Sequence, residues 1–327
     1  MINFAESIFS IKSRAKFNSA TLALFHYQAE YVSVYSKFLK ALSVNHEAIT
    51  EVDQIPFLPV AFFKTHKVIS KENEAELVFS SSGTTGEITS QHFIVDIKVY
   101  QKSFRECFQN FYGDVSEYCV LALLPSYLER KGSSLVYMAD DLIKESKHPL
   151  SGFYLNNYKE LSEKLKVLRD KKQKTILLGV TYAMLDLAEQ FPLSFPELII
   201  METGGMKGKR KEMLREELHQ KLCKAFNVTH IHSEYGMTEL LSQAYSKEKG
   251  IYKAPPWMKI LIRDRNDPKY YLPSNSTGGI NVIDLANIYS CAFIATQDLG
   301  KQLDDESFEV LGRFDNSDLR GCNLMVE

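Results

Sequence analysis

The sequence has few cysteines and no long apolar run, and each shortage excludes a class of protein. Its five cysteines are scattered among 327 residues without the CxxC or Cys/His spacing of a zinc site. Because the number of cysteines is odd, they cannot all pair in disulfides, and we expect free thiols. No apolar stretch reaches the roughly 18 residues of a membrane-spanning helix, and we therefore expect no membrane span.

The chain also lacks an excess of either charge. Lys and Arg total 39 against 41 Asp and Glu, which gives a formal net charge of −2. Because nucleic-acid-binding surfaces are usually basic, we expect no nucleic-acid partner. The first residues, MINFAESIFSIKS, lack the basic-then-apolar order of a secretion signal, and this favours a cytoplasmic protein.

What the sequence does contain is an alternation of short apolar segments with longer amphipathic ones. The segments predicted as strands are 76–80, 118–124, 133–143, 175–179, 197–202 and 228–233. Those predicted as helices are 98–112, 158–169, 183–190 and 209–226. This order is typical of βαβ units, so we predict an α/β fold with parallel-rich sheets flanked by helices.

The turn-forming residues and the spacing of apolar residues predict four regions in the chain. Residues 1–70, with helical spacing from Thr21 to Leu42, form a helical N-terminal cap and lead-in. Residues 71–240 form an α/β core. The turn-rich residues 241–311 form a smaller β-rich lobe, and 312–327 form a hinge-like C-terminal segment.

A run of hydroxyls and glycines, SSSGTTG, spans Ser80 to Gly86 directly after the apolar Leu77–Phe79. Backbone N–H groups and side-chain hydroxyls in such a loop can surround a polyphosphate. The run is not a Walker A loop, because Glu87–Thr89 follows where Gly-Lys-Ser/Thr would stand. A surface turn without a ligand explains it equally well. The candidate phosphate-binding residues are Ser81, Ser82, Gly83, Thr84, Thr85 and Gly86.

Two further motifs follow predicted strands, where ligands of parallel sheets gather. Gly204 and Gly205 allow a flat ligand to lie close to the backbone, although a strained turn is the alternative. The motif YGMTE, which spans Tyr235 to Glu239, offers an aromatic ring for a base, the flexible Gly236, and the Thr238 hydroxyl for a phosphate oxygen. Its last residue is a carboxylate that can hold Mg²⁺.

Two later segments add groups that suit a ribose. Asp298 is expected in a turn, TQDLG, and Arg313 follows in GRFD. A carboxylate can accept hydrogen bonds from both ribose hydroxyls, and a guanidinium can contact ribose or phosphate. Each segment taken alone also fits an ordinary surface turn.

The order of these five motifs resembles the adenylate-forming acyl-CoA synthetase superfamily. The stretches IPFLPVAFFKTHKV, LLPSYLERKGSSLVYM, GVTYAMLD and LGRFDNSDLRGCNLM are similar to one of its branches. This branch is the acyl-protein synthetase family, which includes the fatty acid activating subunit of the bacterial luminescence reductase. The resemblance implies the large N-terminal domain of the superfamily fold.

The resemblance also implies an activity: a carboxylic acid condenses with ATP to an acyl-adenylate, and the acyl group then passes to a thiol. It assigns Ser81–Gly86 to the β,γ-phosphates, Gly204, Gly205 and Tyr235 to adenine, and Thr238 to the α-phosphate. Glu239 becomes the Mg²⁺ ligand, Asp298 binds the ribose hydroxyls, and Arg313 lies near the ribose. The residues that match the acyl site are Ser126, Tyr127, Ser134 and Thr181.

The chain departs from the superfamily in two respects. Thr89 stands where a lysine usually follows the phosphate loop. The sequence also ends at Glu327, soon after the hinge-like segment, so we expect the full C-terminal mobile domain to be absent. In the acyl-protein synthetase family a cysteine near the C-terminus accepts the acyl group, and Cys322 is the position that matches.

Three functions therefore remain open. The first is a ligase that activates a fatty or other hydrophobic acid and acylates its own Cys322, for hand-over to an acyl reductase or acyltransferase protein. The second passes the acyl group directly to CoA, a carrier protein or another acceptor. The third is a non-catalytic scaffold that binds nucleotide or acyl group.

Overall fold

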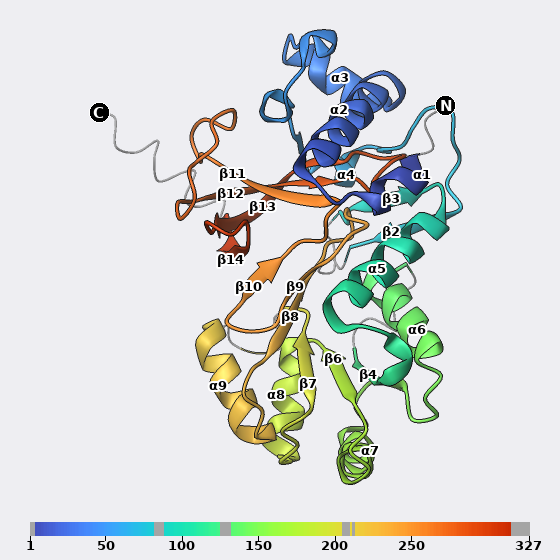
Figure 1. The fold of residues 1–327 in the computed structure, drawn as a ribbon, viewed down its shortest axis with the longest axis vertical. Helices are drawn as coiled ribbons and strands as arrows, with labels where there is room; N and C mark the ends of the chain where they lie inside the picture. The colour runs from blue at the N-terminus through green and yellow to red at the C-terminus, as the bar shows by residue number, and fades with distance from the viewer. Residues whose placement is uncertain (1–3, 82–87, 125–131, 205–209, 211–212, 315–327) are drawn as a thin grey trace. The chain divides into compact units, whose positions relative to one another are not determined.

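The computed structural model describes residues 4–81, 88–124, 132–204, 210 and 213–314. These residues group into two compact units (Figure 1). Unit 1 comprises the described residues of Met1–Glu74 and Pro256–Glu327. Unit 2 comprises those of Ala75–Pro255. Each unit has its own strands and its own helices.

The main sheet of unit 2 is parallel over most of its width. Its strands run in the order β10-β9-β8-β7-β6-β4-β5. The strands from β5 to β8 pair in parallel, and β9 and β10 continue the sheet with antiparallel pairing. The bounds are β4 Cys119–Leu123, β5 Gly152–Tyr154, β6 Thr175–Gly179, β7 Ile199–Glu202, β8 His232–Tyr235, β9 Ala244–Ser246 and β10 Ile251–Lys253.

The central strands β4 and β6 explain why the sheet is parallel. All five residues of each strand are buried, so neither strand alternates between apolar and polar side chains. Strands buried on both faces are a property of parallel sheets covered by crossover helices. The bounds of the unit 2 helices are α5 Ile97–Tyr112, α6 Ser134–Ser146, α7 Tyr158–Asp170, α8 Thr181–Gln190 and α9 Arg215–Phe226, and the short 3-10 helix η4 is Val115–Glu117.

The phosphate-loop candidate lies on a second, smaller sheet of unit 2. Strands β2 (Leu77–Ser80) and β3 (Gln91–Ile94) form an antiparallel pair, with Ser80 opposite Gln91. The SSSGTTG run therefore stands in the sequence between two strands that pair with each other as a hairpin. It does not follow a strand of the parallel sheet, and the predicted position of this loop was wrong in that respect.

Unit 1 combines an antiparallel sheet with N-terminal helices. Its strands run β11-β12-β13-β14, and the short β1 pairs in parallel with β13. The strand bounds are β1 Leu58–Pro59, β11 Met258–Arg263, β12 Thr277–Asp284, β13 Phe293–Gln302 and β14 Phe308–Arg313. The helices are α1 Phe4–Ser7, α2 Arg14–Tyr31, α3 Ser33–Ala41 and α4 Phe62–Thr65, with 3-10 turns η1 Ile8–Ser10, η2 His46–Ala48 and η3 Val52–Gln54.

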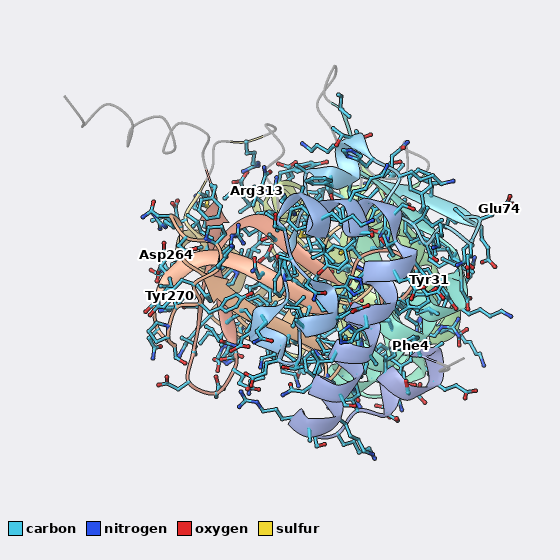
Figure 2. All side chains as sticks on the ribbon, turned by 90° about the horizontal axis from the view of Figure 1, so that it is seen from above. Phe4, Tyr31, Glu74, Asp264, Tyr270 and Arg313 are labelled. Carbon is cyan, nitrogen blue, oxygen red and sulfur yellow. The ribbon has the colours of Figure 1, made fainter. Side chains whose placement is uncertain are left out.

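Helix α2 is tied to the strands of unit 1 by a buried amide and by aromatic packing. The Gln28 side chain donates to the carbonyl of Asn287 at 2.6 Å and accepts from the N–H of Ala292 at 2.9 Å. Phe25 packs edge-on against Phe293 of β13, with ring centroids 5.9 Å apart. Figure 2 labels Tyr31 at the end of α2, and Asp264 and Tyr270 in the connection after β11. These contacts join segments that are distant in sequence into one unit.

The structure confirms the predicted mixed α/β fold and corrects three local predictions. Residues 133–143 form helix α6 and not a strand, because Ser133 caps the helix by accepting from the N–H of Val136 at 3.3 Å. Strand β8 begins at His232, four residues later than predicted. Asp298 lies inside β13 and not in a turn. Among the helices of the described residues, none is long and apolar enough to cross a membrane.

Candidate active site

The parallel strands of unit 2 end in a single row. Leu123 of β4 lies opposite both Tyr154 of β5 and Gly179 of β6, and Gly179 lies opposite Glu202 of β7. Glu202 in turn pairs with Ser233 of β8. In open parallel sheets ligands bind beyond this carboxyl edge. The row is therefore the natural place for a small-molecule site in this unit.

Several predicted site residues follow this row directly. Thr181 begins α8, two residues after β6, and is buried. Gly204 comes two residues after β7, and Tyr235 is the last residue of β8. Gly236, Thr238 and Glu239 follow β8, and the Glu239 residue is 6% exposed. The fold thus brings the glycine motif and the YGMTE motif to neighbouring strand ends.

Other predicted residues lie outside the described ranges. They are Ser82, Gly83, Thr84, Thr85 and Gly86 of the phosphate loop, Ser126 and Tyr127 of the acyl site, Gly205, and Cys322. Their roles stay predictions.

Glu202 fixes the backbone at the glycine motif. Its Oε2 accepts the N–H of Gly204 at 2.7 Å and lies 3.5 Å from the hydroxyl of Thr181, which donates to it. Gly204 has φ +74°, a left-handed conformation that glycine adopts without strain. The carboxylate therefore orients the turn that starts the predicted adenine segment.

A second buried carboxyl, Glu234 of β8, directly follows Ser233, the residue that pairs with Glu202. Burial and the charge of Glu202 raise the pKa of Glu234 to about 8, so it holds a proton at neutral pH. Burial opposes the ionisation of Glu202, but its polar neighbours His219, Ser233 and Gly204 outweigh that effect and lower its pKa. One acid of the pair is thus neutral and the other charged. A Cβ added at Gly236 would meet Glu234 Oε1 at 2.3 Å, so this glycine leaves room for the acid.

His92 connects the hairpin to the YGMTE motif. The ring lies on β3, is buried, and its Nδ1 donates to the carbonyl oxygen of Thr238 at 2.9 Å. Burial lowers the pKa of His92 to about 4, so the imidazole is neutral at pH 7. The backbone of the predicted α-phosphate residue is thereby held against the strand that leaves the predicted phosphate loop.

The hairpin end and the acyl-site helix are also attached to each other. Ser81 N donates to Ser90 O at 3.0 Å, and the Ser81 hydroxyl accepts from Ser90 N at 2.9 Å. Gly132 accepts from the N–H of Ser80 at 2.7 Å and stands two residues before Ser134, the first residue of α6. The chain that leads into α6 is thus bound to strand β2 of the hairpin.

Tyr235 has a defined ring position. It is 8% exposed, and its ring lies 6.0 Å from that of Tyr252 in an edge arrangement. Its hydroxyl is 3.7 Å from the sulfur of Met237.

Unit 1 carries the two residues predicted for the ribose, and they face each other across adjacent strands. Asp298 of β13 pairs with Arg313 of β14, and Arg313 Nε lies 3.4 Å from Asp298 Oδ1. The carboxylate is nearly buried, with 9% of its side chain exposed, whereas the guanidinium is 79% exposed. Such an exposed ion pair contributes little stability, about 0 to 1 kcal/mol. The Arg313 side chain is thus held only weakly.

Sequence reasoning missed Glu234 and His92, and it gave Glu202 no role. An acid ends each of the segments IIME and HSE, and a charge at the end of an apolar strand was a usable signal. His92 had no such signal, because a single histidine on a strand is common in ordinary cores. In the described ranges, no group of three or more His, Cys, Asp or Glu side chains forms a ready metal site.

Known proteins resemble this chain in sequence. Residues 8–121 match the model of the family described as acyl-protein synthetase, LuxE. A long-chain-fatty-acid–luciferin-component ligase of Photorhabdus luminescens is 39% identical over 66 residues. That segment is 20% of this chain and 56% of the relative, so it spans little more than half of that protein. The predicted resemblance to this family is confirmed.

Solved structures resemble the chain in fold. An open form of 2-hydroxyisobutyryl-CoA ligase, in complex with 2-HIB-AMP and CoA, has a TM-score of 0.69 and 10% identity. The match covers 94% of this chain and 72% of that one. ATP-bound MatB from Rhodopseudomonas palustris has a TM-score of 0.55 and 16% identity, and the match covers 72% of this chain and 47% of that one. The predicted adenylate-forming fold is confirmed.

Proposed function

We propose that this chain, whose residues 8–121 match the acyl-protein synthetase family, uses ATP to activate a fatty or other hydrophobic carboxylic acid as its acyl-adenylate. The observation that carries the proposal is the row of strand ends in unit 2, where Gly204 and the YGMTE motif follow neighbouring parallel strands. The ATP-bound relative with this fold supports the choice of nucleotide.

The proposed nucleotide contacts follow the family motifs residue by residue. Ser81 to Gly86 take the β,γ-phosphates, Gly204, Gly205 and Tyr235 take adenine, and Thr238 takes the α-phosphate. Asp298 and Arg313 take the ribose. The buried Glu202 and His92 support these assignments, because they fix the backbone of Gly204 and Thr238, respectively.

The described residues could bind Mg²⁺ only if the nucleotide phosphates supply further ligands. Glu239 supplies one buried carboxylate, and the described residues contain no cluster of three metal-ligating side chains. Mg²⁺ is commonly held by one or two carboxylates together with substrate phosphates. We propose Glu239 as the protein ligand. The bound ion would neutralise phosphate charge.

The chemistry we propose needs positioning more than covalent help from the protein. A carboxylate oxygen of the acid attacks the α-phosphorus, a new P–O bond forms, and the bond to the bridging oxygen breaks as pyrophosphate leaves. The Thr238 segment, held by His92, fixes the attacked phosphate group. Ser126, Tyr127, Ser134 and Thr181 are proposed to line the acyl site.

The second step we propose is transfer to a thiol. The Cys322 thiolate attacks the acyl carbon, a thioester forms, and AMP leaves with the oxygen that joined it to the acyl group. Hand-over to a reductase or acyltransferase protein would then follow. The four cysteines in the described part of the chain are poor alternatives, since Cys107, Cys119 and Cys291 are buried and Cys223 is half-buried.

The test has two stages. Purified protein with ATP, Mg²⁺ and a series of fatty acids should exchange labelled pyrophosphate into ATP only when a suitable acid is present. Labelled acid should then remain attached in a hydroxylamine-labile form, and Cys322→Ser should abolish that attachment while exchange continues. Retention of the label in Cys322→Ser, with Cys223→Ser as the matched control, would refute self-acylation at Cys322.

A further inference from the structure

Arg263, the last residue of β11, uses its guanidinium to bind the backbone of two neighbouring strands. Its Nη1 donates to the carbonyl of Ile280 at 2.7 Å and to Asn281 Oδ1 at 2.7 Å. Its Nη2 donates to the carbonyl of Thr296 at 2.6 Å. One side chain thus connects β11, β12 and β13 of unit 1.

These contacts lie at a break in the β12–β13 ladder. Gly279 pairs with Leu299, and Asn281 pairs with Ala295. One residue of β12 therefore faces three of β13, namely Thr296, Gln297 and Asp298. A bulge removes ladder hydrogen bonds and changes the direction of side chains, and bulges are frequent beside active sites. The carbonyls that Arg263 binds, those of Ile280 and Thr296, belong to this bulge.

The bulge places Asp298. The Thr296 hydroxyl donates to the carbonyl of Ile280 at 2.9 Å and accepts the N–H of Asp298 at 3.1 Å. Arg263 binds the same Ile280 carbonyl and the carbonyl of Thr296 itself. Arg263 is therefore two hydrogen bonds away from the backbone of Asp298, and Thr296 is the residue between them.

Arg263 also contacts the chain where it leaves β14. Its guanidinium carbon lies 5.5 Å from the ring centroid of Phe314. Phe314 in turn donates its N–H to the carbonyl of Gln297, inside the bulge, at 2.9 Å. Phe314 directly follows Arg313, which Figure 2 labels at this end of the sheet. Arg263 therefore contacts both the bulge and the segment that follows Arg313.

We propose that Arg263 is a positioning residue that holds the β13 bulge and thereby aims Asp298 at the ribose hydroxyls of ATP. This inference rests on the ribose role of Asp298 in the proposed function. Arg263 suits the task because its planar fork satisfies several carbonyl groups at fixed angles, which a lysine ammonium cannot reproduce. Gly279, directly opposite Arg263, leaves the required space, since a Cβ there would meet Arg263 Cζ at 2.5 Å.

The experiment compares ATP with 2′,3′-dideoxy-ATP in acid-dependent pyrophosphate exchange by the full chain. The variants are Arg263→Lys, Thr296→Val, Asp298→Asn and the double variant of Arg263→Lys with Asp298→Asn. Arg265→Lys, an exposed residue in the connection after β11, is the matched control. The ratio of kcat/KM for the two nucleotides is the readout. A purely structural loss lowers both rates together and leaves the ratio unchanged.

We expect the wild-type protein to prefer ATP, and Arg263→Lys and Thr296→Val each to reduce this preference about tenfold. The double variant should lose no more than Asp298→Asn alone, because both changes act on one contact. Arg265→Lys should keep the full preference. If Asp298→Asn loses the preference but Arg263→Lys and Thr296→Val keep it, the positioning role is refuted and the ribose role stands. If the wild-type protein shows no preference for ATP, or if Asp298→Asn keeps the full preference, the ribose role fails and this inference fails with it.

Discussion

The two units present their proposed nucleotide residues in different ways. In unit 2, Thr181, Gly204 and Gly236 each come within two residues of the end of a parallel strand. In unit 1, Asp298 lies within an antiparallel strand, at a bulge supported by Arg263. A parallel sheet supplies a site at its edge through its topology. An antiparallel sheet needs a local irregularity to do so.

The supporting residues differ in the same way. Unit 2 uses buried acids and a neutral histidine to hold single backbone groups, as Glu202 does for Gly204 and His92 for Thr238. Unit 1 uses one guanidinium to hold several carbonyls at once. Substitutions of Glu202 and His92 should therefore act separately, whereas those around the bulge should act together.

The largest effect should come from the carboxylate that ends the YGMTE motif. Glu239→Gln removes the proposed Mg²⁺ ligand, and we expect acid-dependent pyrophosphate exchange to fall about 100-fold or more, the size of loss seen when one stabiliser of transition-state charge is removed. Glu248→Gln, a half-exposed acid in the same unit, is the control and should retain the wild-type rate. Equal exchange rates for the two variants would contradict a catalytic site at the carboxyl edge of the unit 2 sheet.

The next largest effect is a pH dependence of stability that comes from the buried acid pair of unit 2, Glu202 and Glu234. The folded pKa of Glu234, about 8, is above its ordinary value of 4.5, so the folded state binds the extra proton between these values. Stability contributed by that protonation is lost as the pH rises toward 8. Relative to wild type, Glu234→Gln should therefore gain about 1.4 kcal/mol of unfolding free energy per pH unit within the window.

Urea unfolding at a series of pH values from 5 to 9 measures this difference. Above pH 8 the difference in unfolding free energy between Glu234→Gln and wild type should become constant. A difference between Glu234→Gln and wild type that is independent of pH would mean that Glu234 is ionised in the folded protein.

A smaller effect tests whether the glycine motif needs its left-handed backbone. Gly204→Ala forces an alanine to φ +74°, although no atom lies within 4 Å of the added Cβ. We expect a loss of about 1–2 kcal/mol of unfolding free energy, measured with urea. Gly152→Ala also has open space but no positive φ, so it isolates the backbone cost. Equal losses in both variants would remove the conformational argument for Gly204.

The smallest effect should come from the link between the hairpin and Thr238. His92→Phe removes the hydrogen bond to the Thr238 carbonyl and should cost about 1 kcal/mol at pH 7. The folded pKa of His92, about 4, is below its ordinary 6.5, so the unfolded state binds more protons in this interval and the wild-type protein loses stability as the pH falls through it.

The difference between wild type and His92→Phe should therefore narrow below pH 6.5 in urea unfolding. His230→Asn, a half-exposed histidine of the same unit, serves as the control. If the difference in unfolding free energy instead grows as the pH falls, His92 is not a buried neutral imidazole.

The position of the motifs at strand ends could be predicted from the sequence, for a physical reason. Buried parallel strands such as β4 and β6 are continuous apolar runs, and the glycines and hydroxyls that follow them stand out from the core. The order of residues alone therefore places the Gly204 and Tyr235–Glu239 motifs at one sheet edge. The helix α6 was missed although its buried residues Met138, Leu142 and Ser146 recur at the spacing of a helix.

The supports of the site were not predictable in the same way. The bulge at Thr296 depends on the pairing of Gly279 and Asn281, which are 15 or more residues away in the chain. The role of Arg263 depends on that bulge and on Phe314, some 50 residues later. The neutral state of Glu234 depends on burial and on a second acid, Glu202, from another strand. Such properties arise only when distant segments meet.

The central claim is that the carboxylic acid attacks the α-phosphorus of ATP, and isotope transfer tests it most directly. A long-chain fatty acid labelled with ¹⁸O in its carboxylate is incubated with the full chain, ATP and Mg²⁺, and the products are analysed by mass spectrometry. One labelled oxygen should appear in AMP and none in pyrophosphate. Label in inorganic phosphate together with formation of ADP, or AMP without label, would contradict acyl-adenylate formation by this protein.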